Sequence, residues 1–367
     1  MLQPCLTARI FHKMQQGMNG KKIPVLTYIV RRFIMIPVTL MGVTLLVFSM
    51  MQLLDPYQLL SAYVSSPAEL KGQNIERLIT KYGLDQPLPV KYARWLGQVA
   101  KGDLGWSESA SMPVGKAIRT KFPLTFELAF YAFFPIILGG FWLGKMTAVR
   151  HNSIFDHSTR MAVIIGWSFP DFVFGLLVIL VFYSWLGWFP PGVLSNWASQ
   201  VVASTEYSNY TGVLTIDALL NGRFDIFWDA LRHLMGPVTT MTYLWSAFLI
   251  RITRSGMLEV LHKDYIRTAR AKGLPEKMII NKHASKNAMI SVLTVAGRLV
   301  IYLLTGTVII ETIFNRPGMG KFVAFAAQQL DYAGILGGTL FFSLVLVLGN
   351  LIVDVLYAVY DPRIQLG

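Results

Sequence analysis

The stretch DYIRTARAKGL, residues 264–274, concentrates charge in a chain that is otherwise apolar. Arg267, Arg270 and Lys272 carry positive charge, and such side chains form ion pairs with acidic groups rather than make or break covalent bonds. Asp264 suits the N-cap of a short helix, and Gly273 suits the left-handed position at which a helix stops. The pattern therefore predicts a short, basic, water-exposed helix that an acidic groove of another protein could receive.

Small side chains lie between these cations, at Ala269 and Ala271. They would allow a partner surface to approach the helix backbone closely. Pro275 follows Gly273 and blocks any continuation of the helix. A second interpretation of the same cations is an anchor on anionic lipid at the membrane surface.

Four ionisable side chains fall within apolar stretches, where charge is costly and therefore marks a functional candidate. They are Glu127, Asp171, Arg298 and Glu311. Glu127 and Glu311 are expected near the outer ends of their stretches, within reach of water. Asp171 follows Pro170, where a helix would bend. Arg298 is expected to be the deepest of the four, either facing a path for a carboxylate-bearing substrate or paired with an acid of this chain or of a partner.

Nucleotide, metal and catalytic motifs are not indicated by the spacing. GGFWLGKM, residues 139–146, resembles a P-loop, but Met146 replaces the hydroxyl that holds Mg²⁺ and no strand precedes it. His151 and His157 share a short loop without cysteine, and His283 is expected to cap or pack beside the basic helix. We therefore predict a non-enzyme that binds no metal and no cofactor.

The composition is that of a membrane protein: 54% of the 367 residues are hydrophobic and 14% are charged, against about 25% charged in soluble domains. Six stretches reach the roughly 20 apolar residues that span a hydrocarbon core. They lie near residues 33–54, 123–146, 161–187, 235–253, 288–312 and 333–357. The fold class predicted is an all-α integral membrane protein with six transmembrane helices.

Lys and Arg residues set the predicted orientation, because they favour cytoplasmic loops. Six of them and no acid precede the first span, and residues 251–287 hold nine basic against three acidic residues. Residues 188–234 hold two basic and four acidic residues. Both termini and the basic helix are therefore placed in the cytoplasm, and the net charge of +13 is attributed to topology rather than to nucleic acid.

The chain divides into a cytoplasmic tail, residues 1–27, and a six-span membrane domain, residues 28–367. Within the domain we expect an external helical cap at 55–121, a second external loop at 188–234 and a cytoplasmic loop at 254–287. The cap should contain one helix that stops at Gly83 and another that ends at Gly102. The second loop should contain two short helical pieces around Asn221-Gly222. The N-terminus lacks a cleavage site and is not expected to be a secretory signal.

Several stretches carry a resemblance when taken together. RTARAKGL with His283-Ala284 ten residues beyond its glycine, YGLDQPLPVKYARWLGQVAKGDLGWS, VIIETIFNRPGMGKFV and VDVLYAVYDPRI resemble the membrane permease subunits of bacterial dipeptide, oligopeptide and nickel ABC importers. The resemblance covers nearly the whole chain from Tyr28. HASKNAM departs from it, since the family usually has leucine at Ser285 and arginine at Lys286.

The resemblance implies a function and a set of partners. The basic helix would be a coupling helix seated in a cleft of an ATP-hydrolysing subunit. The residues implied in that docking are Asp264, Arg267, Ala269, Arg270, Ala271, Lys272, Gly273 and His283. The partners implied are a second homologous permease, two ATP-binding subunits that hold ATP and Mg²⁺, and an external substrate-binding protein, in the bacterial inner membrane. Peptide is the expected substrate, with nickel or another small solute as the alternative.

Two hypotheses of other classes compete with this one. An ATP-independent secondary transporter or channel should show proton-relay carboxylates near mid-membrane. A structural assembly factor would use the basic loop only as an anchor. Glycines 297, 306, 337, 338 and 349 are expected to line helix contacts, either with a second permease or within this chain. The turn Arg316-Pro317-Gly318-Met319-Gly320 is expected to be a tight external hairpin that shapes the outer mouth.

Overall fold

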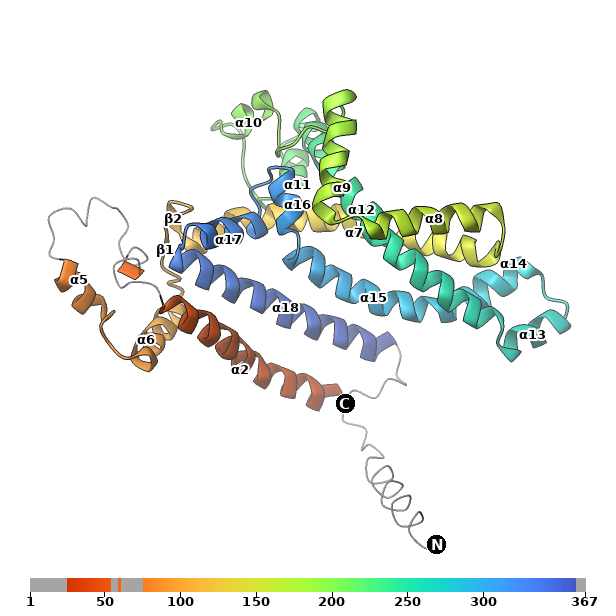
Figure 1. Cartoon of the computed structure of the whole chain (residues 1–367), viewed down its shortest axis with the longest axis horizontal. Helices are drawn as coiled ribbons and strands as arrows, with labels where there is room; N and C mark the ends of the chain where they lie inside the picture. The colour runs from red at the N-terminus through yellow and green to blue at the C-terminus, as the bar shows by residue number, and fades with distance from the viewer. Residues whose placement is uncertain (1–24, 54–58, 61–74, 361–367) are drawn as a thin grey trace, which may run out of the picture.

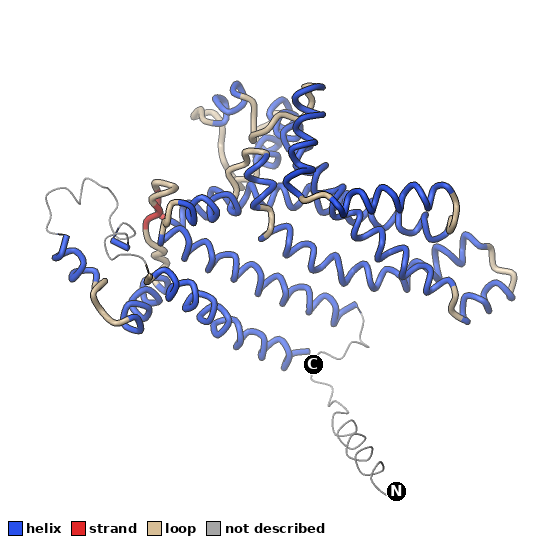
Figure 2. The backbone as a smooth tube through the Cα atoms, in the orientation of Figure 1, coloured by secondary structure: helices blue, strands red, loops and turns tan. Residues whose placement is uncertain are grey.

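The computed structural model describes residues 25–53, 59–60 and 75–360 (Figures 1 and 2). Most of the predicted tail, residues 1–27, and part of the predicted cap lie outside the described residues. The elements, labelled as in Figure 1, are α2 (Val25–Met51), α5 (Ile75–Tyr82), α6 (Leu88–Ala100), β1 (Trp106–Ser107), β2 (Met112–Pro113), α7 (Val114–Val149), α8 (Ile154–Ser168), α9 (Asp171–Val178), the π-helix η2 (Ile179–Trp185), α10 (Asn196–Val202), α11 (Leu214–Leu220), α12 (Phe224–Leu261), α13 (Asp264–Ala271), α14 (Glu276–Met278), the π-helix η3 (Ile279–Ala284), α15 (Ser285–Thr305), α16 (Val308–Ile313), α17 (Met319–Gln328) and α18 (Tyr332–Tyr360).

Long helices run along the length of the molecule, with α13 at one end and α5, α6 and the β1–β2 hairpin towards the other (Figure 1). The central pair is α7 and α12, against which α15 packs, while α18 lies beside α2. Leu128 and Ile136 of α7, Leu234 of α12 and Leu303 of α15 meet in the main apolar core. The all-helical class predicted from the sequence is the class observed in the described residues.

Among the described residues, three helices are long and apolar enough to cross a membrane: α2 over Phe33–Met51, α7, and α18 over Tyr332–Val355. The number rises to five if each of two bent helix pairs is one span. α12 has the length of a span, at 38 residues, but its charge-free part contains several hydroxyl residues, which lower its hydropathy. Six spans therefore remains a prediction, with α12 as the segment that decides it.

The third predicted span, 161–187, is not one helix. α8 ends at Ser168 and α9 begins at Asp171, and the two axes differ by 108°. Phe169 is extended, with φ −86° and ψ 130°, the conformation favoured before a proline. Pro170 has no N–H with which to continue the α8 ladder. The bend predicted at Pro170 is thus a complete break.

The fifth predicted span, 288–312, also ends early. α15 stops at Thr305, Gly306 is its C-cap, and α16 is a separate helix of six residues. Glu311 accordingly lies on α16 rather than inside a span. Residues 188–234, predicted as a second external loop, follow the prediction of two helical pieces more closely: α11 ends beside Asn221, and Gly222 has φ +68°. The second helical piece there is the first part of α12.

The hairpin end carries the amphipathic helices predicted for the cap. α5 ends before Gly83, which has φ +67°, and α6 ends before Gly102, which has φ +82°. Both glycines occupy left-handed positions that disfavour a side chain. Tyr92 of α6 packs on Phe48 of α2 with ring centroids 5.3 Å apart. These two predicted helices are confirmed, whereas the β1–β2 hairpin was not anticipated.

Buried carboxylates fix the chain at two turns. Asp331 caps α18 through a bond from the Gly334 N–H (2.9 Å) and also accepts the hydroxyls of Ser107 (2.5 Å) and Ser109 (2.6 Å) from the hairpin. Asp156, near the start of α8, accepts a bidentate pair from Arg254 of α12, at 2.8 Å each. Bidentate arginine–carboxylate pairs are among the stronger polar contacts. The α7–α8 turn is therefore tied to the part of α12 that leads into α13.

The glycines expected at helix contacts pack mostly inside this chain. A Cβ at Gly337 would meet Val114, one at Gly338 would meet Val323, and one at Gly349 would meet Ile301. Gly306 would meet Tyr302 of its own helix end. Of the two alternatives, contacts within the chain account for these four positions.

Candidate functional site: the α13 helix and the buried ionisable residues

α13 begins one residue earlier than the sequence pattern suggested. Lys263 is the N-cap, and Asp264 is the first helical residue rather than the cap. The Asp264 side chain is 97% exposed and lies 3.7 Å from Arg267. Lys263 Nζ instead pairs with Glu259 Oε1 at 2.8 Å, and this hydrogen bond raises the pKa of the Lys263 ammonium. The carboxylate of Asp264 still interacts favourably with the positive end of the helix dipole at the N-terminus of α13.

The end of α13 has the predicted geometry. Gly273 has φ +73°, and its N–H donates to Arg270 O at 2.9 Å while the Leu274 N–H donates to Ala269 O at 3.3 Å. Arg270 then pairs across the turn with Glu276, Nη2 to Oε1, at 2.7 Å. Arg270 is therefore already balanced by an acid of its own loop, which leaves the other cations of α13 to carry its outward charge.

The inward face of α13 is fixed to the body of the protein. Ile266 is fully buried and Ala269 is 8% exposed. Both join an apolar cluster with Met257 of α12 and Ile279 of η3. This placement corrects the expectation that Ala269 opens towards a partner, because its small side chain serves packing within this chain.

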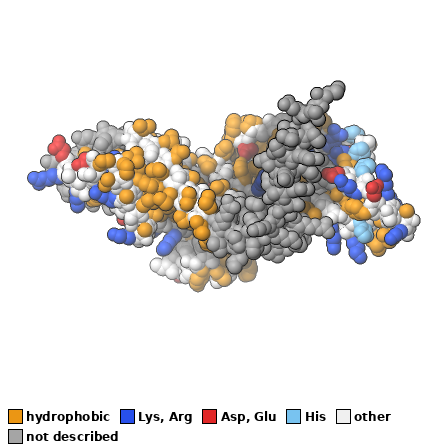
Figure 3. All heavy atoms as spheres, turned by 90° about the horizontal axis from the view of Figure 1, so that it is seen from below, with side chains coloured by type: hydrophobic (Ala, Val, Ile, Leu, Met, Phe, Trp, Pro, Cys, Tyr) orange, Lys and Arg blue, Asp and Glu red, His pale blue; other side chains and the backbone are white. Residues whose placement is uncertain are grey.

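The outward face is exposed and basic. Arg267, Ala271, Lys272 and Gly273 are all exposed, and a Cβ at Gly273 would meet no heavy atom of the described residues within 4 Å. Figure 3 shows Lys and Arg side chains gathered at the α13 end of the molecule. The helix therefore presents an unobstructed surface, while its other side is held by the core.

His283 lies in η3, beside α13, and is half-buried. Its carbonyl accepts a bond from Asn287 Nδ2 (3.1 Å), and the same nitrogen donates to Tyr265 Oη of α13 (2.9 Å). His283 is thus part of the support of α13 rather than of its outward face. This agrees with the expectation that it packs beside the helix.

Glu127 and Glu311, expected near water, are each 1% exposed. Glu127 Oε2 pairs with Arg316 Nη2 at 2.9 Å, and its Oε1 accepts both the N–H and the hydroxyl of Thr215 at 2.8 Å. Glu311 Oε1 accepts the hydroxyls of Thr125 (2.5 Å) and Thr307 (2.9 Å). We call Glu127, Glu311, Arg316 and these three threonines the Arg316 cluster.

Arg316 is the member that sequence reasoning missed. The sequence places Arg316 in a turn that is expected to shape the outer mouth, yet it is the largest fully buried side chain among the described residues, 1% exposed. Its Nε and Nη1 have no hydrogen-bond partner in the part of the chain that the structure describes. The cluster also accounts for the glycine at position 318, because a Cβ there would meet the Glu311 carboxylate. An arginine between Asn315 and Pro317 gives no signal of burial, since Glu127, the acid with which it pairs, lies 189 residues earlier in the sequence.

Asp171 and Arg298 do not join this cluster. Asp171 is the first residue of α9, directly after the break, and is half-buried. Arg298 is on the exposed side of α15, and no ion pair involves it within the described residues. The four predicted candidates therefore separate into a buried pair and two outlying residues, and a role for any of them in transport stays a prediction.

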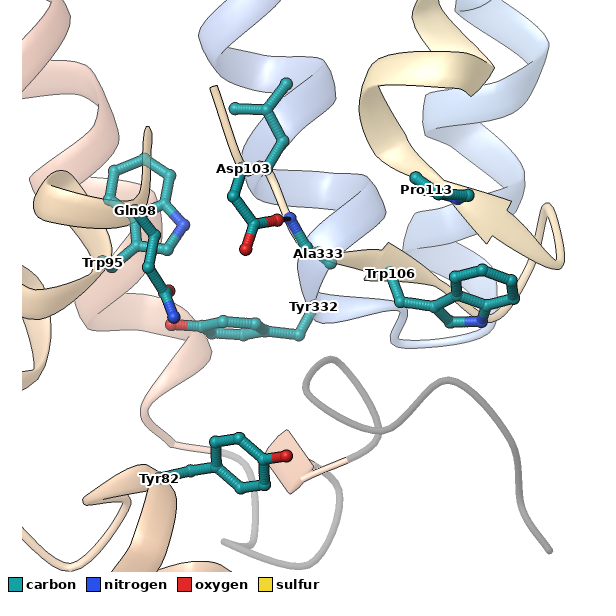
Figure 4. Close-up of a pocket in the computed structure, with 10 residues that line it drawn as sticks. Tyr82, Trp95, Gln98, Asp103, Trp106, Pro113, Tyr332 and Ala333 are labelled. Carbon is teal, nitrogen blue, oxygen red and sulfur yellow. Dashed lines mark hydrogen bonds between the residues drawn. The ribbon is translucent and has the colours of Figure 1, made fainter. Parts of the chain in front are cut away.

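A cavity of about 270 Å³ lies at the hairpin end. In Figure 4, Tyr332 and Gln98 lie on one side of it and Trp106 on the other, with Asp103 projecting between them. Asp103 Oδ1 accepts the Gly105 N–H at 2.9 Å. Ligand pockets usually measure roughly 300–1,000 Å³, so the size alone does not mark this cavity as a binding site.

The P-loop-like GGFWLGKM lies far inside α7, so it does not directly follow a strand as a P-loop does. Gly140 and Gly144 of this stretch face Leu249 and Thr253 of α12. They serve helix packing there. Within residues 25–53, 59–60 and 75–360, no group of three or more His, Cys, Asp or Glu residues could hold a metal ion.

The long apolar helices and the exposed α13 define the class: a multi-helix membrane protein with a short, exposed, basic helix at one end. The family described as "Binding-protein-dependent transport system inner membrane component" matches residues 136–366, and the chain belongs to it. This confirms the resemblance recognised in the sequence.

Named relatives cover nearly the whole chain. The di/tripeptide transport system permease protein of Pseudomonas aeruginosa (strain UCBPP-PA14) is 36% identical over 342 residues, 93% of this chain and 99% of its own. The probable D,D-dipeptide transport system permease protein of Escherichia coli (strain K12) is 40% identical over 329 residues, 89% of this chain and 94% of its own. The oligopeptide transport system permease protein of Bacillus subtilis (strain 168) is 37% identical over 341 residues, which cover 92% of this chain and 99% of its own.

Proposed function

We propose that this chain is the permease subunit of an ATP-driven importer that moves peptides inward from an external binding protein. Family membership supports the permease role, and the names of the relatives, all peptide transport systems, favour peptide over nickel. The observation that carries the proposal is the two-faced α13: Ile266 is locked into the core while Arg267 and Lys272 are exposed.

The two faces suit a coupling helix. A helix that transmits motion must be rigidly joined to the spans on one side and open to its partner on the other. Lys and Arg predominate in residues 251–287, nine against three acids, which favours a cytoplasmic position for α13 and for both termini. We propose that residues 254–287 form the cytoplasmic coupling loop. Residues 55–121 would form the external cap, and residues 188–234 the second external loop.

The partners follow from this role. Two ATP-binding subunits would hold ATP and Mg²⁺, so this chain itself would bind no cofactor and catalyse no reaction. A second, homologous permease would complete the path across the inner membrane, and α13 would convert closure of the ATPase pair into rigid-body movement of the spans. Arg267 and Lys272 would face acidic groups of the docking cleft.

The experiment compares wild type with Gly273→Trp and Gly222→Trp, each purified from native membranes with its partners. Both glycines have positive φ, +73° and +68°, and at both a Cβ would meet no described atom within 4 Å. The two substitutions therefore impose the same backbone strain at opposite parts of the chain. We expect Gly273→Trp to lose the ATP-binding subunits but keep the second permease, and Gly222→Trp to keep all of them.

Two results would contradict the proposal. Retention of the ATP-binding subunits by Gly273→Trp would show that α13 does not dock them. Purification of the wild type without any partner would leave α13 as a lipid anchor. Uptake of a labelled dipeptide by cells carrying each variant should follow the same order.

A further inference from the structure

A groove runs between α7, α8 and α12, which lie side by side in Figure 1. Its volume is about 770 Å³, within the range of roughly 300–1,000 Å³ that is typical of ligand sites. α7 contributes Pro135 and Gly139 to its lining, α8 contributes Ser158, and α12 contributes Thr242 and Ser246. The groove is mostly apolar, so its few hydroxyls are the groups that could orient a ligand.

The hydroxyls of α12 form a row. Thr239, Thr242 and Ser246 follow one another at intervals of three and four residues, which places them on one face of the helix, and all three line the groove. Thr242 Oγ1 and Ser246 Oγ are buried, and neither has a hydrogen-bond partner in the part of the chain that the structure describes. Ser246 as a whole is 7% exposed.

Several hydroxyls elsewhere in the long helices are satisfied locally, although Thr253 Oγ1 of α12, outside the lining of the groove, is also buried without a partner among the described residues. Thr240 donates to Gly236 O (3.0 Å), Thr305 to Ile301 O (2.8 Å) and Ser168 to Ile164 O (2.8 Å), the usual bond to the carbonyl four residues back. Thr242 and Ser246 make no such bond. A buried hydroxyl without a partner destabilises the fold, so these two donors have no use in the structure of this chain by itself.

Contacts between the surrounding helices fix the position of the groove lining. Tyr243 Oη donates to Ala162 O of α8 at 2.9 Å, and its ring stacks on Phe174 of α9 at 4.7 Å. On the α7 side, a Cβ at Gly139 would meet no described atom within 4 Å, whereas one at Gly140 would collide with Leu249. Close packing against α12 therefore requires a glycine at position 140, whereas position 139 borders open space that a larger side chain could fill.

We propose that this groove is a passage for the translocating peptide, and that Thr242 and Ser246 hydrogen-bond its amide groups as it moves. The inference rests on the proposed function and deepens it. An extended peptide has unpaired N–H and C=O groups along its whole length. A lipid chain has none, and a neighbouring membrane helix satisfies its own, so a peptide is the occupant that matches two unused hydroxyls.

The first test fills the groove. Gly139→Leu is compared with Gly42→Leu, since Gly42 is an exposed glycine of α2 whose Cβ would also meet no described atom within 4 Å. Each variant is assembled with its partner subunits and binding protein in proteoliposomes, and uptake of radiolabelled dialanine and pentaalanine is measured. We expect Gly139→Leu to lose uptake by at least about tenfold, as a lost 1.4 kcal/mol would, more for pentaalanine, with assembly and ATP hydrolysis unimpaired.

Three results would overturn the inference. Uptake of both peptides by Gly139→Leu at the wild-type rate would show that the groove is not on the path. Loss of the second permease from Gly139→Leu would make the groove a seat for a helix of that subunit. Failure of the wild type to take up either peptide would instead remove the proposed function, and the groove with it.

The second test removes the hydroxyls, through Thr242→Val and Ser246→Ala. We expect the KM for dialanine uptake to rise about threefold to tenfold for each, the effect of one neutral hydrogen bond. The thermal stability of the complex should stay equal or increase, because an unpaired group has been removed. Thr240→Val, which removes a hydroxyl already bonded to Gly236, should leave the KM unchanged. Lower stability with unchanged KM in Thr242→Val and Ser246→Ala would contradict the inference.

Discussion

Around α13, charged side chains extend into solvent: Arg267 is 71% exposed, Asp264 is 97% exposed, and their closest charged atoms are 3.7 Å apart. In the Arg316 cluster, Arg316 and Glu127 are each 1% exposed and 2.9 Å apart. Water screens the first pair, and its members are nearly independent of each other. The second pair is buried away from solvent, so each member depends on the other. The comparison separates charge available to a partner from charge used to hold the fold.

Of the substitutions that test this comparison, Arg316→Met should lower the stability of the protein most. It leaves Glu127 buried without a counter-charge, and breaking a buried pair costs about 3–5 kcal/mol. The measurement is the thermal unfolding midpoint of the detergent-solubilised complex. The double variant Arg316→Met with Glu127→Gln removes both charges and should recover much of the loss. An unchanged midpoint in the single variant would show that the cluster is not interdependent.

Asp331→Ala tests whether the hairpin end depends on a buried carboxylate in the same manner. The change leaves the hydroxyls of Ser107 and Ser109 and the Gly334 N–H without their acceptor. Unsatisfied buried groups cost about 1–3 kcal/mol. We expect faster protease cleavage within the β1–β2 hairpin and a lower unfolding midpoint. Cleavage at the wild-type rate would contradict this role of Asp331.

Ser153→Ala and Asp264→Ala distinguish a true N-cap from an exposed first-turn acid. Ser153 Oγ accepts the Asp156 N–H at 3.2 Å, and loss of such a cap costs about 1 kcal/mol. Asp264 makes no cap bond, so its loss should cost only about 0.3–0.5 kcal/mol. Unfolding midpoints of the two variants, measured side by side, decide the point. An equal or larger loss for Asp264→Ala would restore the capping role expected from the sequence.

Arg267→Ala and Lys272→Ala should change stability least, within about 0.5 kcal/mol, as is usual for surface positions. Their effect should appear in partner retention instead. We expect fewer ATP-binding subunits to co-purify, and the difference from wild type to shrink in high salt, which screens exposed charges. Normal retention in low salt would show that these cations are not part of the docking surface.

The sequence predicted the elements whose signals are local. Gly83, Gly102 and Gly273 each end a helix at a positive φ, as the pattern of apolar residues and glycines indicated. Pro170 marked a bend, although the size of the break depends on how α8 and α9 pack on α12. Hydrophobic length predicted α2, α7 and α18, but not α16, because Gly306 ends α15 within an otherwise apolar run.

Contacts between distant segments could not be predicted in this way. The partner of Arg316 lies 189 residues earlier, at Glu127, and no spacing rule connects them. Ala269 looked suited to a partner because it is small, yet small residues also serve tight packing within a chain, and the sequence alone does not distinguish the two uses. The inward face of α13 became visible only with its neighbours Met257 and Ile279 in place.

The central claim is that α13 has one face fixed to this chain and one face for an ATP-binding subunit. It is tested most directly by single cysteines at position 269 and position 271, in a Cys5→Ser background that removes the one native cysteine. Ala271→Cys should react with a maleimide in the permease alone and be protected once the ATP-binding subunits are added. Ala269→Cys should stay unreactive in both states. Equal labelling of Ala271→Cys with and without those subunits would contradict the claim.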